Sequence, residues 1–210
     1  MMKSIYLIRH GETEWNKIRR FQGFNNDIEL NEAGRCQARM LQQALAEIAF
    51  DRIVASDLIR ARETAEILNE PHGLDIELDP KLREMNFGCW EGLNFQQVKE
   101  KYPREAEIWL TEPETLKIPG GETFQELFNR VWQRFIFWTQ KNDYQNMAIV
   151  CHGGTCAALI CGVLNAPIEN MWQYLQGNTA VNIVEMEVAG QYILKGYNDK
   201  SHLENQNECP

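Results

Sequence analysis

Two histidines in this chain directly follow short apolar runs. Ile5–Ile8 precede Arg9 and His10, and Met147–Cys151 precede His152. In an open α/β sheet, ligands bind outside the carboxyl ends of the strands, where the next helix can direct backbone N–H groups at an anion. An arginine beside a histidine at such an edge can bind a phosphate group and supply a nucleophile for its phosphorus. The pattern predicts phosphoryl-transfer chemistry.

Two further segments bring polar side chains to the same edge of the predicted sheet. Arg60 follows the apolar run Arg52–Ser56 at the start of a predicted helix, and Glu84 lies in the loop Leu82–Gly88. Each residue alone has a simpler structural explanation, because an arginine commonly forms a surface ion pair and a lone histidine commonly packs near the core. Only the combination of these segments favours a catalytic site.

Composition restricts the partners of the protein. The chain has 210 residues and a net charge of −9, with an isoelectric point near 5.0. An acidic protein is not expected to bind nucleic acid or anionic membranes nonspecifically. A small phosphorylated metabolite is the expected partner, and positive charge must then be concentrated locally.

The elements that position these residues alternate between strand and helix, which is typical of an α/β fold. We predict a three-layer α/β/α sandwich with a mainly parallel sheet. Helices are expected from Asn31 to about Ile48, from Leu58 to Leu68, and over an apolar stripe from Phe124 to Ile136. Strands are expected at Ser4–Ile8, Arg52–Ser56, Met147–Cys151, Val181–Val188 and Tyr192–Tyr197.

The alternation is interrupted by a helical insertion at about residues 93–123, which we expect to form a lid over the strand ends. Residues 1–210 are predicted to be a single domain, with a polar tail at about residues 201–210 that frays.

The cysteines show neither zinc-ligand nor Cys-x-x-Cys spacing. Cys151, Cys156 and Cys161 are therefore expected to be buried free thiols. With no targeting segment and no apolar run of the ~20 residues needed to span a bilayer, the chain is expected in the cytoplasm.

Four segments, in their order along the chain, resemble those of the histidine phosphatase superfamily, in its phosphoglycerate mutase-like branch. They are Arg9–Gly11, Ala55–Ala61, Leu82–Gly88 and Val150–Gly154. The resemblance covers nearly the whole chain. Within that branch, Phe87–Glu91 and Pro119–Glu122 look most like α-ribazole phosphatases, which dephosphorylate a precursor in cobalamin biosynthesis.

The resemblance implies catalysis without a metal or cofactor. His10 would be the nucleophile that forms a phosphohistidine, and Glu84 would protonate the leaving alkoxide and then activate water. His152 would donate a hydrogen bond to the phosphoryl group. The phosphate oxygens would be bound by Arg9, Arg60 and Asn16.

Contacts to the rest of the substrate are expected from Gln22, Gly23 and Gly153. The family's usual Gln-Gly-x-x-Asp-x-Pro-Leu stretch is Gln22–Leu30 here, with one extra residue and no proline. We also expect three neighbours of Arg60 to brace its guanidinium group: Ser56, Asp57 and Arg62.

The lid favours a phosphatase acting on a monoester such as α-ribazole 5′-phosphate. It is shorter than in the family's mutases and carries more glutamates than basic residues, which suits a bisphosphate poorly. Its aromatic side chains could contact an apolar leaving group or only pack the lid: Trp90, Phe95, Tyr102 and Trp109. Alternatives are a phosphoglycerate mutase and a noncatalytic phosphate-binding protein. Apolar lid surface could equally serve a homodimer contact.

Overall fold

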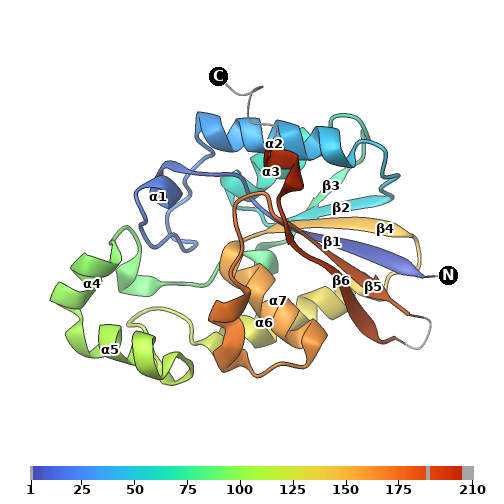
Figure 1. Cartoon of the computed structure of the whole chain (residues 1–210). Helices are drawn as coiled ribbons and strands as arrows, with labels where there is room; N and C mark the ends of the chain where they lie inside the picture. Colours follow the sequence, from blue (N-terminus) through green and yellow to red (C-terminus); the bar gives the residue numbers. More distant parts are fainter. Residues whose placement is uncertain (1, 188–189, 205–210) are drawn as a thin grey trace.

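A computed structural model describes residues 2–187 and 190–204 of the chain. In these residues, one sheet of six strands has the order β3-β2-β4-β1-β5-β6 (Figure 1). The strands span β1 (Lys3–Arg9), β2 (Arg52–Ala55), β3 (Ile76–Leu78), β4 (Asn146–Cys151), β5 (Val181–Met186) and β6 (Tyr192–Asp199).

The register of the central strands aligns their carboxyl ends. Arg9 at the end of β1 pairs in parallel with Cys151 at the end of β4, and Ala55 at the end of β2 pairs in parallel with Val150. β5 runs antiparallel to β1 and to β6. The sheet is therefore mainly parallel, as predicted, and the residues that follow β1, β2 and β4 meet at one edge.

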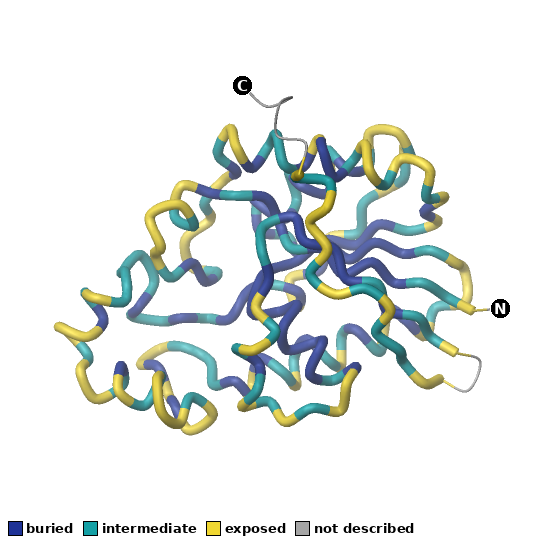
Figure 2. Tube along the Cα trace, viewed as in Figure 1, coloured by how far each residue is buried: buried dark blue, intermediate teal, exposed yellow. Residues whose placement is uncertain are grey.

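Helices cover both faces of the sheet, which confirms the three-layer α/β/α fold (Figure 1). On one face, α2 (Glu32–Leu45) and α3 (Ile59–Asn69) pack through residues such as Leu41 and Leu68 onto Ile8 and Ile53. On the other face, α6 (Phe124–Thr139) and α7 (Gly153–Leu164) pack against β1 and β4. Figure 2 shows that burial is concentrated in the central strands and in the helices that flank them.

The short elements lie mostly outside the sandwich. Residues 93–123 form α4 (Phe95–Lys101), α5 (Pro103–Thr111) and η3 (Pro113–Thr115), to one side of the sheet (Figure 1). The other short helices are α1 (Glu14–Lys17), η1 (Pro80–Leu82), η2 (Gly88–Trp90), η4 (Ile168–Tyr174) and η5 (Ser201–Leu203).

Helix α6 begins where its sequence places the cap. The Thr123 hydroxyl accepts a hydrogen bond from the Glu126 backbone N–H, and the Glu126 carboxylate accepts one from the Thr123 backbone N–H. This reciprocal capping satisfies donors that a helix N-terminus otherwise leaves free.

Several boundaries differ from the prediction. Strand β3 was not predicted, because three residues with no alternating burial give no periodic signal. Helix α2 ends at Leu45, before the expected Ile48. Ser201–Leu203 of the predicted tail form η5; residues 205–210 of that tail, like Val188 of the predicted β5, lie outside the described residues.

The cysteines follow the prediction at the strand–helix junction and depart from it elsewhere. Cys151, Cys156 and Cys161 are free thiols, of which all three are buried. Cys36, in contrast, is disulfide-bonded, which no sequence spacing had indicated. Among the described residues, no helix combines the length and apolarity that crossing a bilayer requires.

A buried carboxylate fixes the chain where β3 leads toward Glu84. Asp79 is 3 % exposed and accepts hydrogen bonds from Arg134, from the Trp138 indole N–H at 2.6 Å and from the Lys81 backbone N–H at 3.0 Å. A buried carboxylate with three donors orders its surroundings, since each donor would otherwise lose its partner.

The D79A variant is expected to lose about 3 kcal/mol of unfolding free energy, because it leaves the buried Trp138 indole N–H and the half-buried Arg134 guanidinium group without their acceptor. Urea unfolding measures this loss. The matched control is D143A, which removes an exposed carboxylate paired with Arg52 at 2.6 Å and should cost less than about 1 kcal/mol. Equal losses in the two variants would contradict a structural role for Asp79.

Candidate active site

His10 is held immediately after β1 with one ring nitrogen available. Its backbone N–H donates to the Cys151 carbonyl oxygen at 3.0 Å, and its Nδ1 lies 2.7 Å from the Gly11 carbonyl oxygen. A carbonyl oxygen can only accept, so Nδ1 carries the proton of this hydrogen bond. In the neutral ring, Nε2 then presents a lone pair, which is the form a nucleophile needs.

His152 faces His10 from the end of β4. The two ring centroids are 5.2 Å apart, and His152 is the N-cap residue of α7. Its Nε2 lies 2.8 Å from the Ser56 hydroxyl oxygen, whereas its buried Nδ1 has no partner among the described residues. With the Ser56 hydroxyl donating to Nε2, Nδ1 carries a proton directed at no protein acceptor.

Two arginines enclose the histidines. Arg60 is completely buried and donates to the Gly23 carbonyl oxygen at 2.9 Å, and Arg9 donates to the Gln176 carbonyl oxygen. Three further buried nitrogens lack a partner within the described chain: Nε of Arg9, and Nε and Nη1 of Arg60. Buried N–H groups are normally paired, so these nitrogens point to an anionic ligand.

Burial lowers the pKa values of all four side chains at the site: Arg9, Arg60, His10 and His152. Burial lowers the pKa of Arg60 to about 10 and also lowers the pKa of Arg9. Burial, and then the charge of Arg60, lower the pKa values of His10 and His152 well below the usual 6.5. Each histidine is therefore neutral near pH 7, while both arginines keep their charge.

Glu84 supplies the negative charge of the site. It is 8 % exposed, and its carboxylate accepts hydrogen bonds from the backbone N–H groups of Met85 at 2.8 Å and of Gly154 at 2.9 Å. Gly154 allows this contact, since a Cβ there would lie 2.5 Å from Glu84 Oε1. The carboxylate thus sits against the N-terminus of α7, where the helix dipole favours an anion.

The Glu84 loop is held by a residue that the sequence analysis missed. Arg130 on α6 donates to the carbonyl oxygens of Lys81, Arg83 and Glu84 at 2.9 to 3.1 Å. Its guanidinium group also forms a two-point contact with Glu122 at 2.7 and 2.8 Å. No local motif marks Arg130, because the backbone oxygens that it binds lie more than forty positions away.

Two amide side chains complete the site through Thr13. The Thr13 hydroxyl donates to Gln22 Oε1 at 2.8 Å and accepts from the Asn16 backbone N–H at 3.1 Å. The Asn16 side-chain oxygen accepts the Thr13 backbone N–H at 3.2 Å. These bonds occupy the amide oxygens, and the buried Gln22 Nε2 has no partner in the described part of the chain.

Residues 25–27 of the loop Gln22–Leu30, which carries the extra residue, form hydrogen bonds with residues outside that loop. Glu91 accepts hydrogen bonds from the Asn25 backbone and side chain and from the Asn26 side chain, at 2.9 to 3.2 Å. Asp27 accepts the Ile59 backbone N–H at 2.8 Å, at the start of α3. The departure from the family pattern therefore leaves Gln22 and Gly23 at the site, with Gly23 bound to Arg60.

The structure also places Gly153 and the three residues that were expected to brace Arg60. Gly153 lies beside Arg9, where a Cβ would be 3.4 Å from Arg9 Nε. The expected bracing of Arg60 was wrong: Ser56 binds His152, Asp57 forms an ion pair with Arg83 at 2.6 Å, and Arg62 lies 3.5 Å from Glu66. Ser56 and Asp57 precede α3, which begins at Ile59, and each of the three side chains has a partner other than Arg60.

Residues 2–187 and 190–204 contain no cluster of three or more histidine, cysteine or acidic side chains arranged to hold a metal ion. The donors at this site are instead guanidinium, imidazole and amide N–H groups, which match the oxygens of a phosphate group.

Comparison with known proteins gives one consistent family. A model of the histidine phosphatase superfamily (branch 1) matches residues 5–200. Phosphoserine phosphatase 1 of Hydrogenobacter thermophilus is 32% identical over 195 residues, 92% of each chain. "Probable phosphoglycerate mutase GpmB" of Erwinia tasmaniensis is 32% identical over 97% of this chain and 96% of its own. The α-ribazole phosphatase structure from Shigella flexneri superposes with a TM-score of 0.87 at 27% identity, covering 94% of this chain and 96% of its own.

The lowered histidine pKa values predict a pH-dependent stability. Below about pH 6.5 the unfolded chain binds protons at His10 and His152 that the folded chain excludes. The unfolding free energy is therefore greatest above about pH 6.5 and falls as the pH drops toward the folded-state pKa values. The slope contributed by each histidine approaches about 1.4 kcal/mol per pH unit.

Chemical denaturation between pH 5 and 7.5 measures this slope, which the H10Q variant should reduce. The control is H72Q, since burial lowers the pKa of His72 less strongly and its removal should change the slope less. Identical slopes in the H10Q variant and the unaltered protein would contradict a buried, neutral His10.

Proposed function

This chain belongs to the histidine phosphatase superfamily and is a phosphatase, and we propose that it hydrolyses small phosphomonoesters, without a metal ion, through a phosphohistidine at His10. The observation that supports this most directly is the set of buried N–H donors around the two histidines. Nitrogens of Arg9, Arg60, Gln22 and His152 lack partners in the described chain although they are buried. Unpaired buried donors are costly, and a phosphoryl group would satisfy all of them.

In the first step, His10 Nε2 attacks phosphorus. A nitrogen–phosphorus bond forms as the bond to the leaving oxygen breaks, and Glu84, in its protonated form, gives its proton to that oxygen. The transition state carries its charge on the equatorial oxygens, where Arg9, Arg60 and His152 donate hydrogen bonds.

In the second step, water replaces His10 on phosphorus. The Glu84 carboxylate, now deprotonated, accepts a proton from water as the water oxygen bonds to phosphorus and the nitrogen–phosphorus bond breaks. His10 returns to its neutral form and inorganic phosphate leaves. The low pKa of His10 suits this cycle, because the nucleophile is unprotonated over the whole neutral range.

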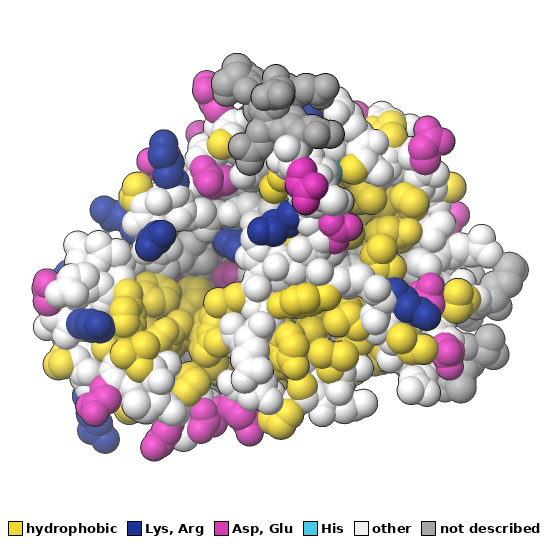
Figure 3. Space-filling model, in the orientation of Figure 1, with side chains coloured by type: hydrophobic (Ala, Val, Ile, Leu, Met, Phe, Trp, Pro, Cys, Tyr) yellow, Lys and Arg dark blue, Asp and Glu magenta, His cyan; other side chains and the backbone are white. Residues whose placement is uncertain are grey.

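For the leaving group, we propose an aromatic or otherwise apolar alcohol such as α-ribazole. Trp109 on α5 lies among five aromatic rings at centroid distances of 4.4 to 6.1 Å: Phe21, Phe87, Trp90, Phe124 and Trp172. Phe21 precedes Gln22, and Phe87 follows Glu84 by three residues. Figure 3 shows hydrophobic side chains gathered beside a hollow near α4 and α5.

Within this aromatic cluster the roles differ. Trp90 is fully buried and belongs to the core. Phe95, Tyr102 and Trp109 are only partly buried, so they remain candidates for contact with substrate. Two alternatives stay open for test: phosphoglycerate mutase activity, and phosphate binding without turnover. The buried Glu84 carboxylate favours an enzyme, because a carboxylate beside a phosphate site weakens binding of the anion.

The E84Q variant separates the two steps. With p-nitrophenyl phosphate, whose leaving group needs little protonation, we expect one rapid equivalent of nitrophenolate per enzyme and then turnover slowed roughly 10²- to 10⁴-fold. Rapid mixing measures the burst, and ³²P-labelled substrate should leave an acid-labile label on the chain that the H10A variant lacks. The activity of the unaltered protein should persist in EDTA.

The control for E84Q is E126Q, since the exposed Glu126 carboxylate also accepts a backbone N–H, but its hydrogen-bond partner in the described chain is Thr123, away from the site. It should retain normal turnover. Full activity of E84Q would remove Glu84 from the mechanism, and phosphate binding with no turnover of any ester by the unaltered protein would favour the noncatalytic alternative. Interconversion of 3- and 2-phosphoglycerate would favour the mutase.

The W109A variant tests the leaving-group site. We expect the preference for α-ribazole 5′-phosphate over phosphoserine, measured as the ratio of kcat/KM values, to fall about tenfold, because ring contacts are lost. The matched control is W132A, whose ring stacks on Phe128 and Phe135 at 6.0 and 5.4 Å, and whose loss should leave the ratio unchanged. A W109A ratio equal to that of the unaltered protein would mean that the aromatic cluster only packs the lid.

A further inference from the structure

The segment between η4 and β5 reaches the nucleophile from a part of the chain that carries no catalytic motif. The Gln176 carbonyl oxygen accepts a hydrogen bond from Arg9, and the Thr179 backbone N–H donates to the His10 carbonyl oxygen at 3.2 Å. Residues 176–179, which we term the support loop, therefore contact two members of the site through backbone atoms.

Asn178 adds a side-chain contact to the same two elements. Its Nδ2 donates to the His10 carbonyl oxygen at 3.1 Å and to the Asn16 side-chain oxygen at 3.2 Å. An amide NH₂ group has two hydrogens, so these two bonds use both. Since both partners are acceptors, the orientation of the Asn178 amide is determined.

The contact also determines how Asn16 faces the site. Asn16 Oδ1 accepts from the Thr13 backbone N–H and from Asn178 Nδ2, each at 3.2 Å. Both lone-pair directions of that oxygen are then occupied. A flipped Asn16 amide would set its NH₂ group against two donors, so the observed orientation is the stable one and keeps Nδ2 available as a donor.

We propose that Asn178 is a positioning residue that holds the Asn16 amide with its NH₂ group toward the phosphate. The proposal rests on the phosphatase function above and on the role that the family resemblance implies for Asn16, a hydrogen bond to a phosphoryl oxygen. Thr179 N–H holds the His10 carbonyl oxygen independently, so loss of the Asn178 side chain acts mainly on Asn16.

The support loop is itself held in a costly conformation. Thr179 has a φ of 53°, which a β-branched residue adopts only when its surroundings enforce it. Its hydroxyl lies 3.0 Å from His202 Nε2, and the Gly177 backbone N–H donates to Asn198 Oδ1 at 3.1 Å. Such enforced geometry is typical of segments that position functional groups.

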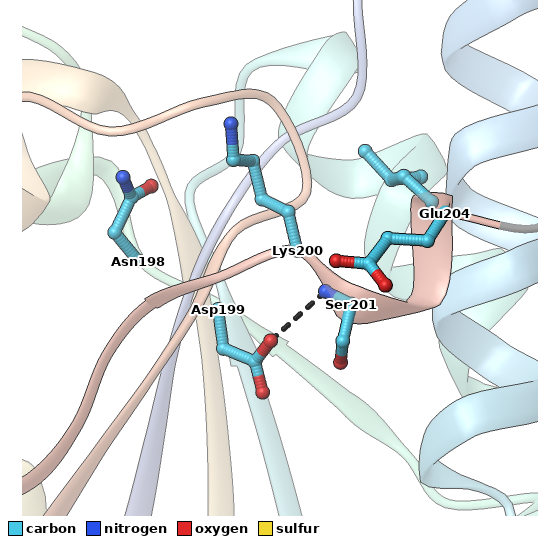
Figure 4. A pocket seen from close by; sticks show the side chains of 6 residues that line it. Asn198, Asp199, Lys200, Ser201 and Glu204 are labelled. Atoms are coloured by element: carbon cyan, nitrogen blue, oxygen red, sulfur yellow. Dashed lines mark hydrogen bonds between the residues drawn. The ribbon is translucent and has the colours of Figure 1, made fainter.

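The end of β6 and the following Lys200 pack against the support loop. Lys200 packs so closely that a Cβ on Gly177 would lie 2.5 Å from its Cδ. Figure 4 shows Asn198 and Lys200 with their neighbours around the adjoining pocket, where the Asp199 carboxylate accepts the Ser201 backbone N–H at 2.9 Å. These contacts of Asn198 and Lys200 keep the support loop in place when the Asn178 side chain alone is altered.

A double-mutant cycle tests the proposal with N16A, N178A and the double variant. The readouts are kcat/KM for p-nitrophenyl phosphate and the competitive inhibition constant of inorganic phosphate. We expect N178A to lower kcat/KM about tenfold and to weaken phosphate inhibition. The N16A variant already lacks the interaction between Asn16 and Asn178. Removing Asn178 as well should therefore lower kcat/KM by no more than about twofold.

The N178D variant sharpens the test, since it sets carboxylate oxygens against two acceptors and should be at least as impaired as N178A. The matched control is N69A, because Asn69 likewise donates to a backbone oxygen, that of Leu74 at 2.6 Å, at the far end of α3. It should lower thermal stability without changing the kinetics. Should N178A fail to fold, N178S takes its place in the cycle.

The positioning role of Asn178 is wrong if the fold-losses in kcat/KM of N16A and N178A multiply in the double variant. It is also wrong if N178D has normal kinetics. Failure of the phosphatase proposal is seen separately, as absence of phosphate release by the unaltered protein from every ester. In that case the same cycle is read by calorimetry with inorganic phosphate, and an N178A variant that binds phosphate normally would still refute the positioning role.

Discussion

The structure depends on burying positive charge without giving it a full set of protein partners. Arg60 is completely buried, yet within the described chain its guanidinium group donates one hydrogen bond, to the Gly23 backbone oxygen. Removing a guanidinium from water is expensive unless it is paired. The protein offsets part of this cost with the Glu84 carboxylate and with carbonyl oxygens, and in the proposed function a phosphoryl group supplies the remaining partners. The same burial keeps both histidines neutral.

Such a site can be stable only if its surroundings are rigid, because a loose loop would turn the donors toward water or toward one another. Each cationic group is held by backbone oxygens from a distant loop: Gly23 for Arg60 and Gln176 for Arg9. Arg130 instead holds a loop: its guanidinium group donates to three backbone oxygens of the segment that carries Glu84. Backbone atoms serve well here because their positions are set by the sheet and helices rather than by side-chain rotamers.

In the proposed function, the leaving group is bound beside aromatic side chains of α4 and α5. Trp109 on α5 packs against Trp172 on η4, with the two ring centroids 4.4 Å apart. Aromatic rings present a broad apolar wall with little conformational freedom to lose. The phosphate end of the substrate would therefore be recognised by charge and the other end by shape.

The sequence by itself determined the sheet, its helices and the identity of the polar residues at the strand ends. These follow from local patterns, since an apolar run that ends in Arg9-His10 or His152 marks both the strand and the edge. It did not reveal β3, which is too short for a periodic signal, nor the partners of Ser56 and Asp57. Tertiary structure alone decided that Arg130 and Asn178 support the site, because hydrogen bonds between residues far apart in the chain depend on packing and leave no pattern in the local sequence.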